Sequence, residues 1–168
     1  VIDYAWKGIR NDFMDIYLGA KCSFCISTHS GWDAIPYIFR RPMVFTNAAI
    51  VAGLFTFQKK YLTIIKEFRD AKSHRNLSLS EIICNRELLY YSPRLFEEKI
   101  ELLENTPEDI RDVVIEMIER LNGTWKTSFE DKELQNHFWN NYPAKGIDIN
   151  GRRLHGTINS LIGTTFLR

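Results

Sequence analysis

The sequence carries almost no surplus charge and lacks a long apolar run. Lys and Arg number 22 against 21 for Asp and Glu, which gives a net charge of +1, whereas a general nucleic-acid binder carries clustered surplus base. The longest apolar candidate, residues 48–57, is well short of the ~20 residues that span a bilayer and is interrupted by Gly53. No signal peptide is visible. We therefore predict a cytoplasmic protein that binds no nucleic acid, and peripheral association with the inner face of the membrane stays open.

Cysteine is scarce as well. The three cysteines, Cys22, Cys25 and Cys84, cannot all pair, and the lack of a secretion signal indicates a reducing compartment. Cys22 and Cys25 have the spacing of a zinc knuckle or a redox motif, but no second pair completes four ligands. Because they fall in a segment typical of a buried strand, we interpret them as small apolar residues and predict neither a metal nor a cofactor.

An alternation of strand and helix patterns fills the first part of the chain. Short apolar runs over 22–26 and 43–46 are typical of strands covered on both faces, and helices are expected over 12–20 and 32–39. A short strand over 1–4 precedes them, and we expect the chain to be a piece of a longer protein without its N-terminal partner domain. This order predicts an α/β fold with a Rossmann-like, mostly parallel sheet flanked by helices.

The two helices show the i, i+3, i+4, i+7 spacing of a buried face. Asp12 is the expected N-cap of the first. The residues expected inside are Phe13, Ile16, Tyr17, Ala20, Ala34, Ile35, Ile38 and Phe39.

Further strands are expected over 61–65 and 100–103, and capping patterns mark the later helices. The expected helix starts are Ser78, Thr106 and Ser128, and Gly123 ends the second of these helices. A last helix is expected over 156–167 after a turn at Asn150-Gly151. Four aromatic residues of this part are interpreted as core: Trp125, Phe129, Phe138 and Trp139. We divide the chain into a sheet domain, 1–123, and a C-terminal helical extension, 124–168.

A hydroxyl-rich loop follows the first apolar strand. Ligands of open parallel sheets bind beyond the carboxyl ends of the strands, and a helix N-terminus offers free amides to a phosphate. Ser27, Thr28 and Ser30 supply hydroxyls, Gly31 permits close approach of the backbone, and His29 is a possible hydrogen-bond donor or proton carrier. The alternative is that Ser30 only caps the helix and Gly31 only permits the turn. We predict a phosphate site here.

Other polar residues fall at the same expected edge of the sheet. Because no acidic cluster suited to magnesium is evident, side-chain cations must balance a diphosphate, and Arg10 is the candidate. Asp33, Asn47, Asn105 and Thr106 are expected to contact ribose, sugar or base. Plainer interpretations are a solvated Arg10, a helix-stabilising Asp33 and a capping Thr106. Weaker candidates follow the strand over 61–65: Lys66, Glu67 and Arg69.

Two segments resemble the C-terminal donor domain of two-domain GT-B glycosyltransferases: residues 13–31 (FMDIYLGAKCSFCISTHSG) and 41–45 (RPMVF). The chain is similar, more narrowly, to a bacterial glycosyltransferase family associated with surface-polysaccharide synthesis. Further pieces fit it over 2–4, 39–42, 104–110 and 166–168. The resemblance implies metal-independent transfer of a sugar from a nucleotide-sugar donor to a glycan or lipid-linked glycan acceptor.

The resemblance also implies roles for individual residues. Ser27, Thr28, Ser30 and Gly31 would contact the donor phosphates, with Arg10 and Asp33 as secondary contacts. His29 stands where related sequences often have a smaller or acidic residue. The general base of an inverting enzyme of this kind commonly lies in the N-terminal domain, so we expect this chain to bind donor and to be inactive alone. A sugar-nucleotide epimerase-like enzyme and a non-catalytic α/β interaction module stay open, because fold alone does not decide chemistry.

Overall fold

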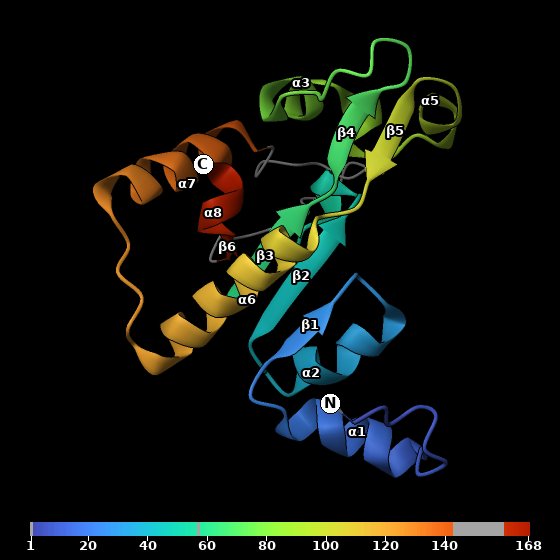
Figure 1. The fold of residues 1–168 in the computed structure, drawn as a ribbon, viewed down its shortest axis with the longest axis vertical. Coiled ribbons are helices and arrows are strands. Elements are labelled where there is room, and N and C mark those ends of the chain that lie inside the picture. The colour runs from blue at the N-terminus through green and yellow to red at the C-terminus, as the bar shows by residue number, and fades with distance from the viewer. Residues whose placement is uncertain (1, 57, 143–159) are drawn as a thin grey trace.

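Four strands that all run in the same direction form the central sheet (Figure 1). The computed structural model describes residues 2–56, 58–142 and 160–168. The order across the sheet is β1-β2-β3-β6. These strands are β1 (Cys25–Ser27), β2 (Met43–Ala48), β3 (Tyr61–Ile65) and β6 (Leu161–Ile162). The predicted α/β class is therefore confirmed, with a mostly parallel sheet, flanking helices and a helix at the C-terminal end.

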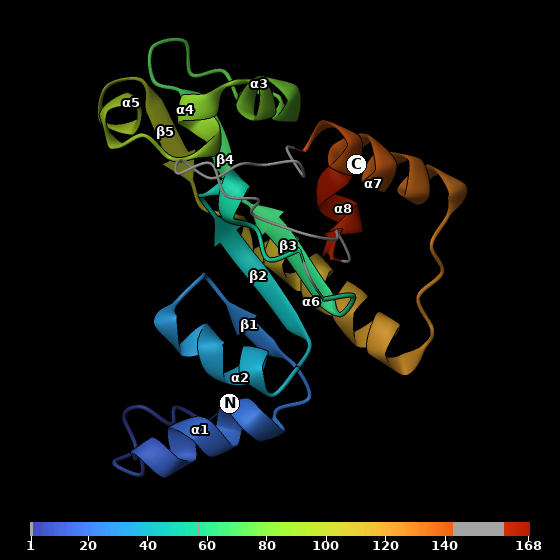
Figure 2. The ribbon, with the colours of Figure 1, turned by 180° about the vertical axis from the view of Figure 1, so that it is seen from behind.

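Helices lie on both faces of the sheet. Successive strand residues point to opposite sides, so each face has apolar side chains for a helix to cover. One face packs against α6 (Pro107–Asn122) through Val44, Leu62, Ile64, Val113 and Met117. The other face carries a second buried cluster of Cys25, Met43, Phe45 and Tyr61. On that side lie α1 (Asp12–Lys21), the short 3₁₀ helix η1 (Gly31–Asp33) and α2 (Ala34–Ile38) (Figure 2).

The ends of α6 are those that the sequence predicts. Thr106 is the N-cap, and its hydroxyl accepts a hydrogen bond from the Asp109 amide while the Asp109 carboxylate accepts one from the Thr106 amide. Gly123 ends the helix with a φ of 73°, a left-handed conformation that favours glycine. Both signals are local in the sequence, which is why they could be predicted.

A second, two-stranded sheet lies beyond the carboxyl ends of β2 and β3 (Figure 1). It pairs β4 (Glu67–Asp70) with β5 (Ile100–Leu103) in antiparallel fashion. The predicted strand over 100–103 therefore exists but does not join the parallel sheet. Short helices pack around the pair: α3 (Leu79–Cys84), α4 (Arg86–Leu89) and α5 (Pro93–Glu98).

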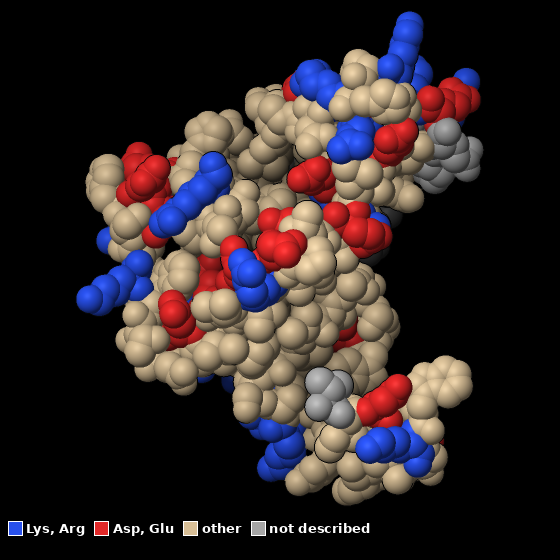
Figure 3. Space-filling view, viewed as in Figure 1, with Lys and Arg blue, Asp and Glu red and all other residues tan. Residues whose placement is uncertain are grey.

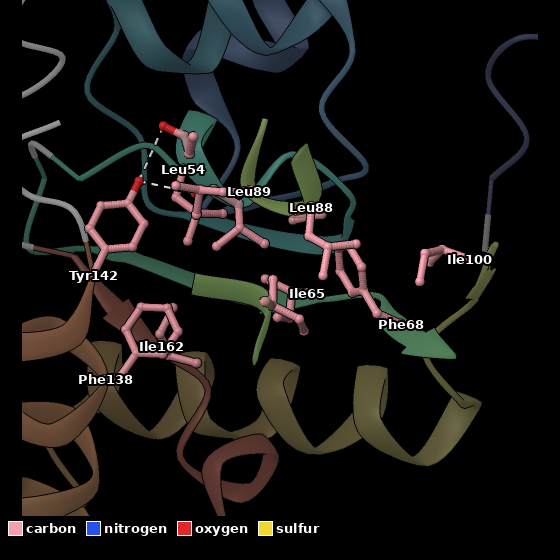
Figure 4. Packing of buried hydrophobic residues seen from close by; sticks show 13 residues of the cluster. Leu54, Ile65, Phe68, Leu88, Leu89, Ile100, Phe138, Tyr142 and Ile162 are labelled. Carbon is pink, nitrogen blue, oxygen red and sulfur yellow. Dashed lines mark hydrogen bonds between the residues drawn. The ribbon is translucent and has the colours of Figure 1, made fainter. Parts of the chain in front are cut away.

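The largest hydrophobic cluster joins this small sheet to the rest of the molecule (Figure 4). Phe68 of β4 and Phe138 of α7 (Phe129–Asn141) are both almost fully buried in it. The Tyr142 hydroxyl lies 3.0 Å from the carbonyl oxygen of Val51 and 3.2 Å from that of Ala52, in the 3₁₀ helix η2 (Val51–Gly53). The loop after β2 is thus held by a residue from far along the chain.

The C-terminal segment differs from its prediction. In place of one helix over 156–167, the described residues form β6 and the short helix α8 (Thr164–Leu167). The predicted turn at Asn150-Gly151 lies outside the described residues, as does the start of the predicted helix. Because β6 pairs with β3, the boundary drawn at 123/124 does not separate the sheet from a purely helical extension.

Buried polar groups fix this C-terminal segment. The Gln135 side chain donates to the carbonyl of Ile162 at 2.5 Å and accepts from the amide of Ile162 at 3.2 Å, so it pairs with the free edge of β6 as another strand would. The Glu116 carboxylate, which is fully buried, accepts from the amide and hydroxyl of Thr164 and pairs with Arg120. Removing either partner of a buried ion pair leaves an uncompensated charge and lowers the free energy of unfolding.

The helices beside β1 bury less than predicted. Phe13, Ile16 and Tyr17 are 71%, 50% and 46% exposed, and Ala20 alone of the four residues expected inside α1 is buried. In the second helix, Ile38 and Phe39 are exposed as well. The physical reason is that β1 is a three-residue edge strand, and no further layer of the described residues covers this side. Gly19 holds α1 against α2, because a Cβ there would lie 2.6 Å from Ile35 Cγ2.

The N-terminal residues also correct the prediction. Residues 2–10 contain turns and no strand, so the predicted strand over 1–4 is wrong for its described part. The N-cap of α1 is Asn11 and not Asp12, since the Asn11 side chain accepts from the Met14 amide at 2.8 Å. Phe129, interpreted as core, is 79% exposed, because it is the first residue of α7.

Charged side chains of both signs are interleaved on the face shown in Figure 3, which includes α6. The picture agrees with the balanced composition of the sequence. Within the described parts of the chain, no helix combines the length and the apolar character needed to cross a membrane.

We predict that Gln135→Ala lowers the free energy of unfolding by about 1–3 kcal/mol, because it leaves the amide and carbonyl of Ile162 without their buried partner. Glu133→Ala, an exposed position on the same helix, is the control and should stay within about 0.5 kcal/mol of the wild type. Urea denaturation measures both. Equal losses for the two variants would show that Gln135 does not hold β6.

Candidate functional site

A pocket of about 350 Å³ lies at the carboxyl ends of the first three parallel strands. Thr28 and His29 reach it after β1, Asn47 at the end of β2, and Lys66 directly after β3. Its remaining lining residues are Ala49, Ile50 and Gly53. We call it the rim pocket. Parallel pairing brings these segments together, as the sequence predicts for the Ser27–Gly31 loop, Asn47 and the weaker candidate Lys66.

The imidazole of His29 is a wall of this pocket. Although the residue as a whole is exposed, its ring stacks on Phe45 with centroids 4.6 Å apart and on Phe55 at 5.6 Å. Desolvation lowers the pKa of His29, and the charge of Asp33 opposes this effect. A neutral imidazole donates from one nitrogen and accepts at the other, so His29 has hydrogen-bonding capacity at neutral pH.

Lys66 supplies the positive charge of the rim pocket. Its ammonium lies 2.5 Å from the Glu104 carboxylate, and the two side chains are 20% and 66% exposed. Among the described residues that line the pocket, Lys66 is the only one with a full charge. An anionic ligand would compete with the more exposed Glu104 for this ammonium.

Asn47 and Asn105, two of the predicted contact residues, hydrogen-bond each other. The amide of each residue donates to the side-chain oxygen of the other at 2.6 Å. Asn105 also donates to the carbonyl of Ile65 at 2.7 Å and is 6% exposed. These bonds tie the ends of β2, β3 and β5 together and leave Asn105 unsuited to a sugar or ribose. Thr106 caps α6, the plainer of the two interpretations of that residue.

Asp33 is the last residue of η1, and its carboxylate reaches back to the start of η1, where the sequence predicts a phosphate. The Ser27 hydroxyl donates to one carboxylate oxygen of Asp33, and the Ser30 amide donates to the other at 2.8 Å. Asp33 is only 4% exposed. A phosphate at this turn would meet a like charge, and the five-residue α2 adds little dipole. The geometry therefore disfavours Ser27 and Ser30 as phosphate contacts and Asp33 as a sugar contact.

Gly31 keeps the open environment that its predicted role requires. In the described part of the chain, the amides of Gly31 and Trp32 make no hydrogen bond, and a Cβ on Gly31 would meet nothing within 4 Å. Arg10 is elsewhere: it pairs with Asp15 at 3.3 Å, is 65% exposed and lines neither pocket described here. The prediction placed Arg10 at the end of a strand that the described residues do not form.

A second pocket of about 290 Å³ lies on the α2 side of the sheet. We call it the aromatic pocket. It is lined by Ser30, Gly31, Asp33, Ala34, Tyr37, Met43, Phe45, Phe55 and Tyr61. The predicted loop is thus divided, with Thr28 and His29 in the rim pocket and Ser30 and Gly31 in the aromatic pocket. The sequence analysis did not identify the aromatic residues of this pocket. They come from separate segments of the chain, and the only sequence signal was that Phe45 and Tyr61 each lie in a predicted strand, where alternate residues share a face.

Cys22 and Cys25 pack in the hydrophobic cluster on the α2 face of the sheet. Cys22 and Cys25 are free thiols, and burial, followed by Cys22 and Asp33, raises the pKa of Cys25 to about 12. A protonated thiol is a poor ligand and a poor nucleophile. Among the described residues, no group of three or more His, Cys, Asp and Glu side chains is placed to hold a metal ion.

We expect His29 to titrate below the 6.5 of an ordinary histidine, because its ring is desolvated against Phe45. Asp33→Asn should lower the pKa of His29 further, since it removes the negative charge that favours the imidazolium. NMR titration of the imidazole resonances measures both values. A pKa at or above 6.5 in the wild type, or a higher pKa in the variant, would contradict this geometry.

No family model, no curated protein and no solved structure matches the chain.

Proposed function

We propose that the rim pocket binds the phosphate-bearing part of a nucleotide-sugar, and that the chain is the donor-binding portion of a glycosyltransferase in bacterial surface-polysaccharide synthesis. The observation that carries the proposal is the position of the pocket beyond the carboxyl ends of three adjacent parallel strands, with Lys66 in its wall. Ligands of open α/β sheets bind at this edge. The sugar transfer itself is supported by the resemblance of residues 13–31 and 41–45 to GT-B donor domains.

The lining of the rim pocket suits an anionic group without a metal. Lys66 supplies charge, and the Thr28 hydroxyl and the His29 imidazole supply hydrogen bonds. Contacts of this kind stabilise a departing diphosphate when the sugar is transferred. On this proposal the phosphates lie toward Lys66 and away from Asp33.

On this proposal, another domain binds the acceptor and supplies the general base. The described lining of the rim pocket contains no carboxylate that could act as general base. Exposed apolar side chains gather on α1, on η1 and at the end of α2, namely Phe13, Ile16, Tyr17, Trp32, Ile38 and Phe39, and such surfaces mark interaction sites. We place a partner domain, which would bring the glycan or lipid-linked glycan acceptor, against this side.

The same exposed side supports a second candidate, a non-catalytic interaction module. Ser27, Asp33 and Asn105 are used within the protein, as they would be in a fold kept only for binding another protein. The two candidates differ in the rim pocket: nucleotide binding there favours the glycosyltransferase.

We predict that Lys66→Gln weakens binding of a nucleoside diphosphate about tenfold, the loss expected from one charge-assisted hydrogen bond. Glu104→Gln should strengthen binding, because it removes the competitor for the Lys66 ammonium. Titration calorimetry with UDP, GDP, ADP and CMP, each against its nucleoside, measures these affinities.

Lys59→Gln is the matched control for this experiment. Lys59 is an exposed lysine before β3, at the opposite end of that strand from Lys66, and its replacement should leave affinity unchanged. Equal losses for Lys59→Gln and Lys66→Gln would remove Lys66 from the site. If none of the four nucleotides bound the wild-type protein, the interaction module would be favoured.

A further inference from the structure

Asp33 is a buried carboxylate that lacks a cationic partner among the described residues. It is 4% exposed, and none of the ion pairs formed by the described residues includes it. Its hydrogen bonds come from the Ser27 hydroxyl and from the amide and hydroxyl of Ser30, all uncharged groups. Buried charges in proteins are as a rule paired. Asp33 therefore leaves negative charge at the wall of the aromatic pocket.

Aromatic rings form most of the remaining wall. Phe45 and Phe55 lie 5.1 Å apart between centroids, and Phe45 and Tyr61 lie 5.6 Å apart at an interplanar angle of 79°. Tyr37 stacks on Phe55 at 6.5 Å. The rings come from α2, from neighbouring strands and from the loop after η2, so the pocket has aromatic surface in several orientations.

The charges around the pocket have one sign. Among the described residues, no lysine, arginine or histidine lines it, and the imidazole of His29 is stacked on Phe45 and Phe55. Tyr61, another lining residue, is affected by this charge, since burial above all, then Tyr37 and Asp33, raises the pKa of its hydroxyl to about 12. The interior is therefore both apolar and negative in potential.

Three classes of ligand fit this interior poorly. An anion would be repelled by Asp33, and an uncharged apolar molecule would leave the carboxylate uncompensated. A small metal ion needs several oxygen ligands, and Asp33 is the only carboxylate among the described residues of the lining. A cation whose charge is spread over methyl or methylene groups satisfies both the rings and the carboxylate, since aromatic faces attract such cations.

We propose that the aromatic pocket binds a small organic cation, an alkylammonium or quaternary ammonium group, with its charge beside Asp33 and its alkyl groups against Phe45, Phe55 and Tyr61. This site is separate from the rim pocket, because the ring of His29 lies against the two phenylalanines between the two cavities. It does not depend on nucleotide binding.

The probes for this proposal are tetramethylammonium and choline, with 3,3-dimethylbutan-1-ol as the uncharged analogue of choline. In titration calorimetry of the whole chain, choline should bind at least about tenfold more tightly than the neutral alcohol, the difference that an aromatic site with a carboxylate provides. Vesicles of phosphatidylcholine, titrated beside free choline, tell a lipid headgroup from a free solute. Binding of either form supports the proposal, and failure of both to bind overturns it.

Two variants assign the binding to the pocket. Asp33→Asn keeps the size of the side chain and removes its charge. It should lower the affinity for choline about tenfold and leave the affinity for the neutral alcohol unchanged. Phe55→Leu removes one ring without touching the Asp33 hydrogen bonds, and it should weaken the binding of choline severalfold. It serves as the second variant in case Asp33→Asn does not fold. Asp112→Asn, a carboxylate on α6 across the sheet, is the control and should change nothing.

The proposal is overturned if choline and the neutral alcohol bind equally, or if Phe55→Leu and Asp112→Asn leave the same affinity for choline. UDP binding is measured on the same variants. Because Phe55 does not line the rim pocket, a loss of choline binding with UDP binding retained would separate this site from the nucleotide site.

Discussion

The carboxylate of Asp33 is the constraint on which the functional region depends. It accepts hydrogen bonds from Ser27 at the end of β1 and from the Ser30 amide at the start of η1, and so fixes the turn between strand and helix. Within that turn His29 has a φ of 63°, an uncommon conformation for a residue other than glycine, and its ring lies against Phe45. The turn thereby becomes a partition between two cavities.

The two cavities differ in electrostatic character because each has a different charged side chain in its wall. On the rim side, Lys66 gives positive charge at the carboxyl ends of the strands, where phosphate-bearing ligands of this fold class are bound. On the α2 side, Asp33 gives negative charge among aromatic rings. A single loop after β1 therefore serves two sites of opposite sign, and the proposals for them are independent. The uncovered apolar side of α1 and α2 would join this region to a partner domain.

Local signals were enough to predict three of the parallel strands, β1, β2 and β3, the capped ends of α6 and the edge of the sheet at which polar loops meet. What the sequence did not reveal depends on contacts between distant residues. The reciprocal bonds of Asn47 with Asn105, and of Gln135 with Ile162, join positions that no spacing rule connects. The pairing of β6 with β3 is of the same kind, and it places a two-residue strand within the range predicted as helix. Hydroxyl and glycine content located the loop, but the burial of Asp33 decided which of its groups remain open to a ligand.

The most direct test of the central claim is a map of amide chemical-shift changes on addition of UDP to the isotope-labelled protein. We expect the largest changes at Thr28, His29, Asn47 and Lys66, with smaller ones at Met43 and Tyr61, which line only the aromatic pocket. Changes confined to Met43, Phe55 and Tyr61, or saturating binding that leaves the amides around Lys66 unmoved, would contradict it.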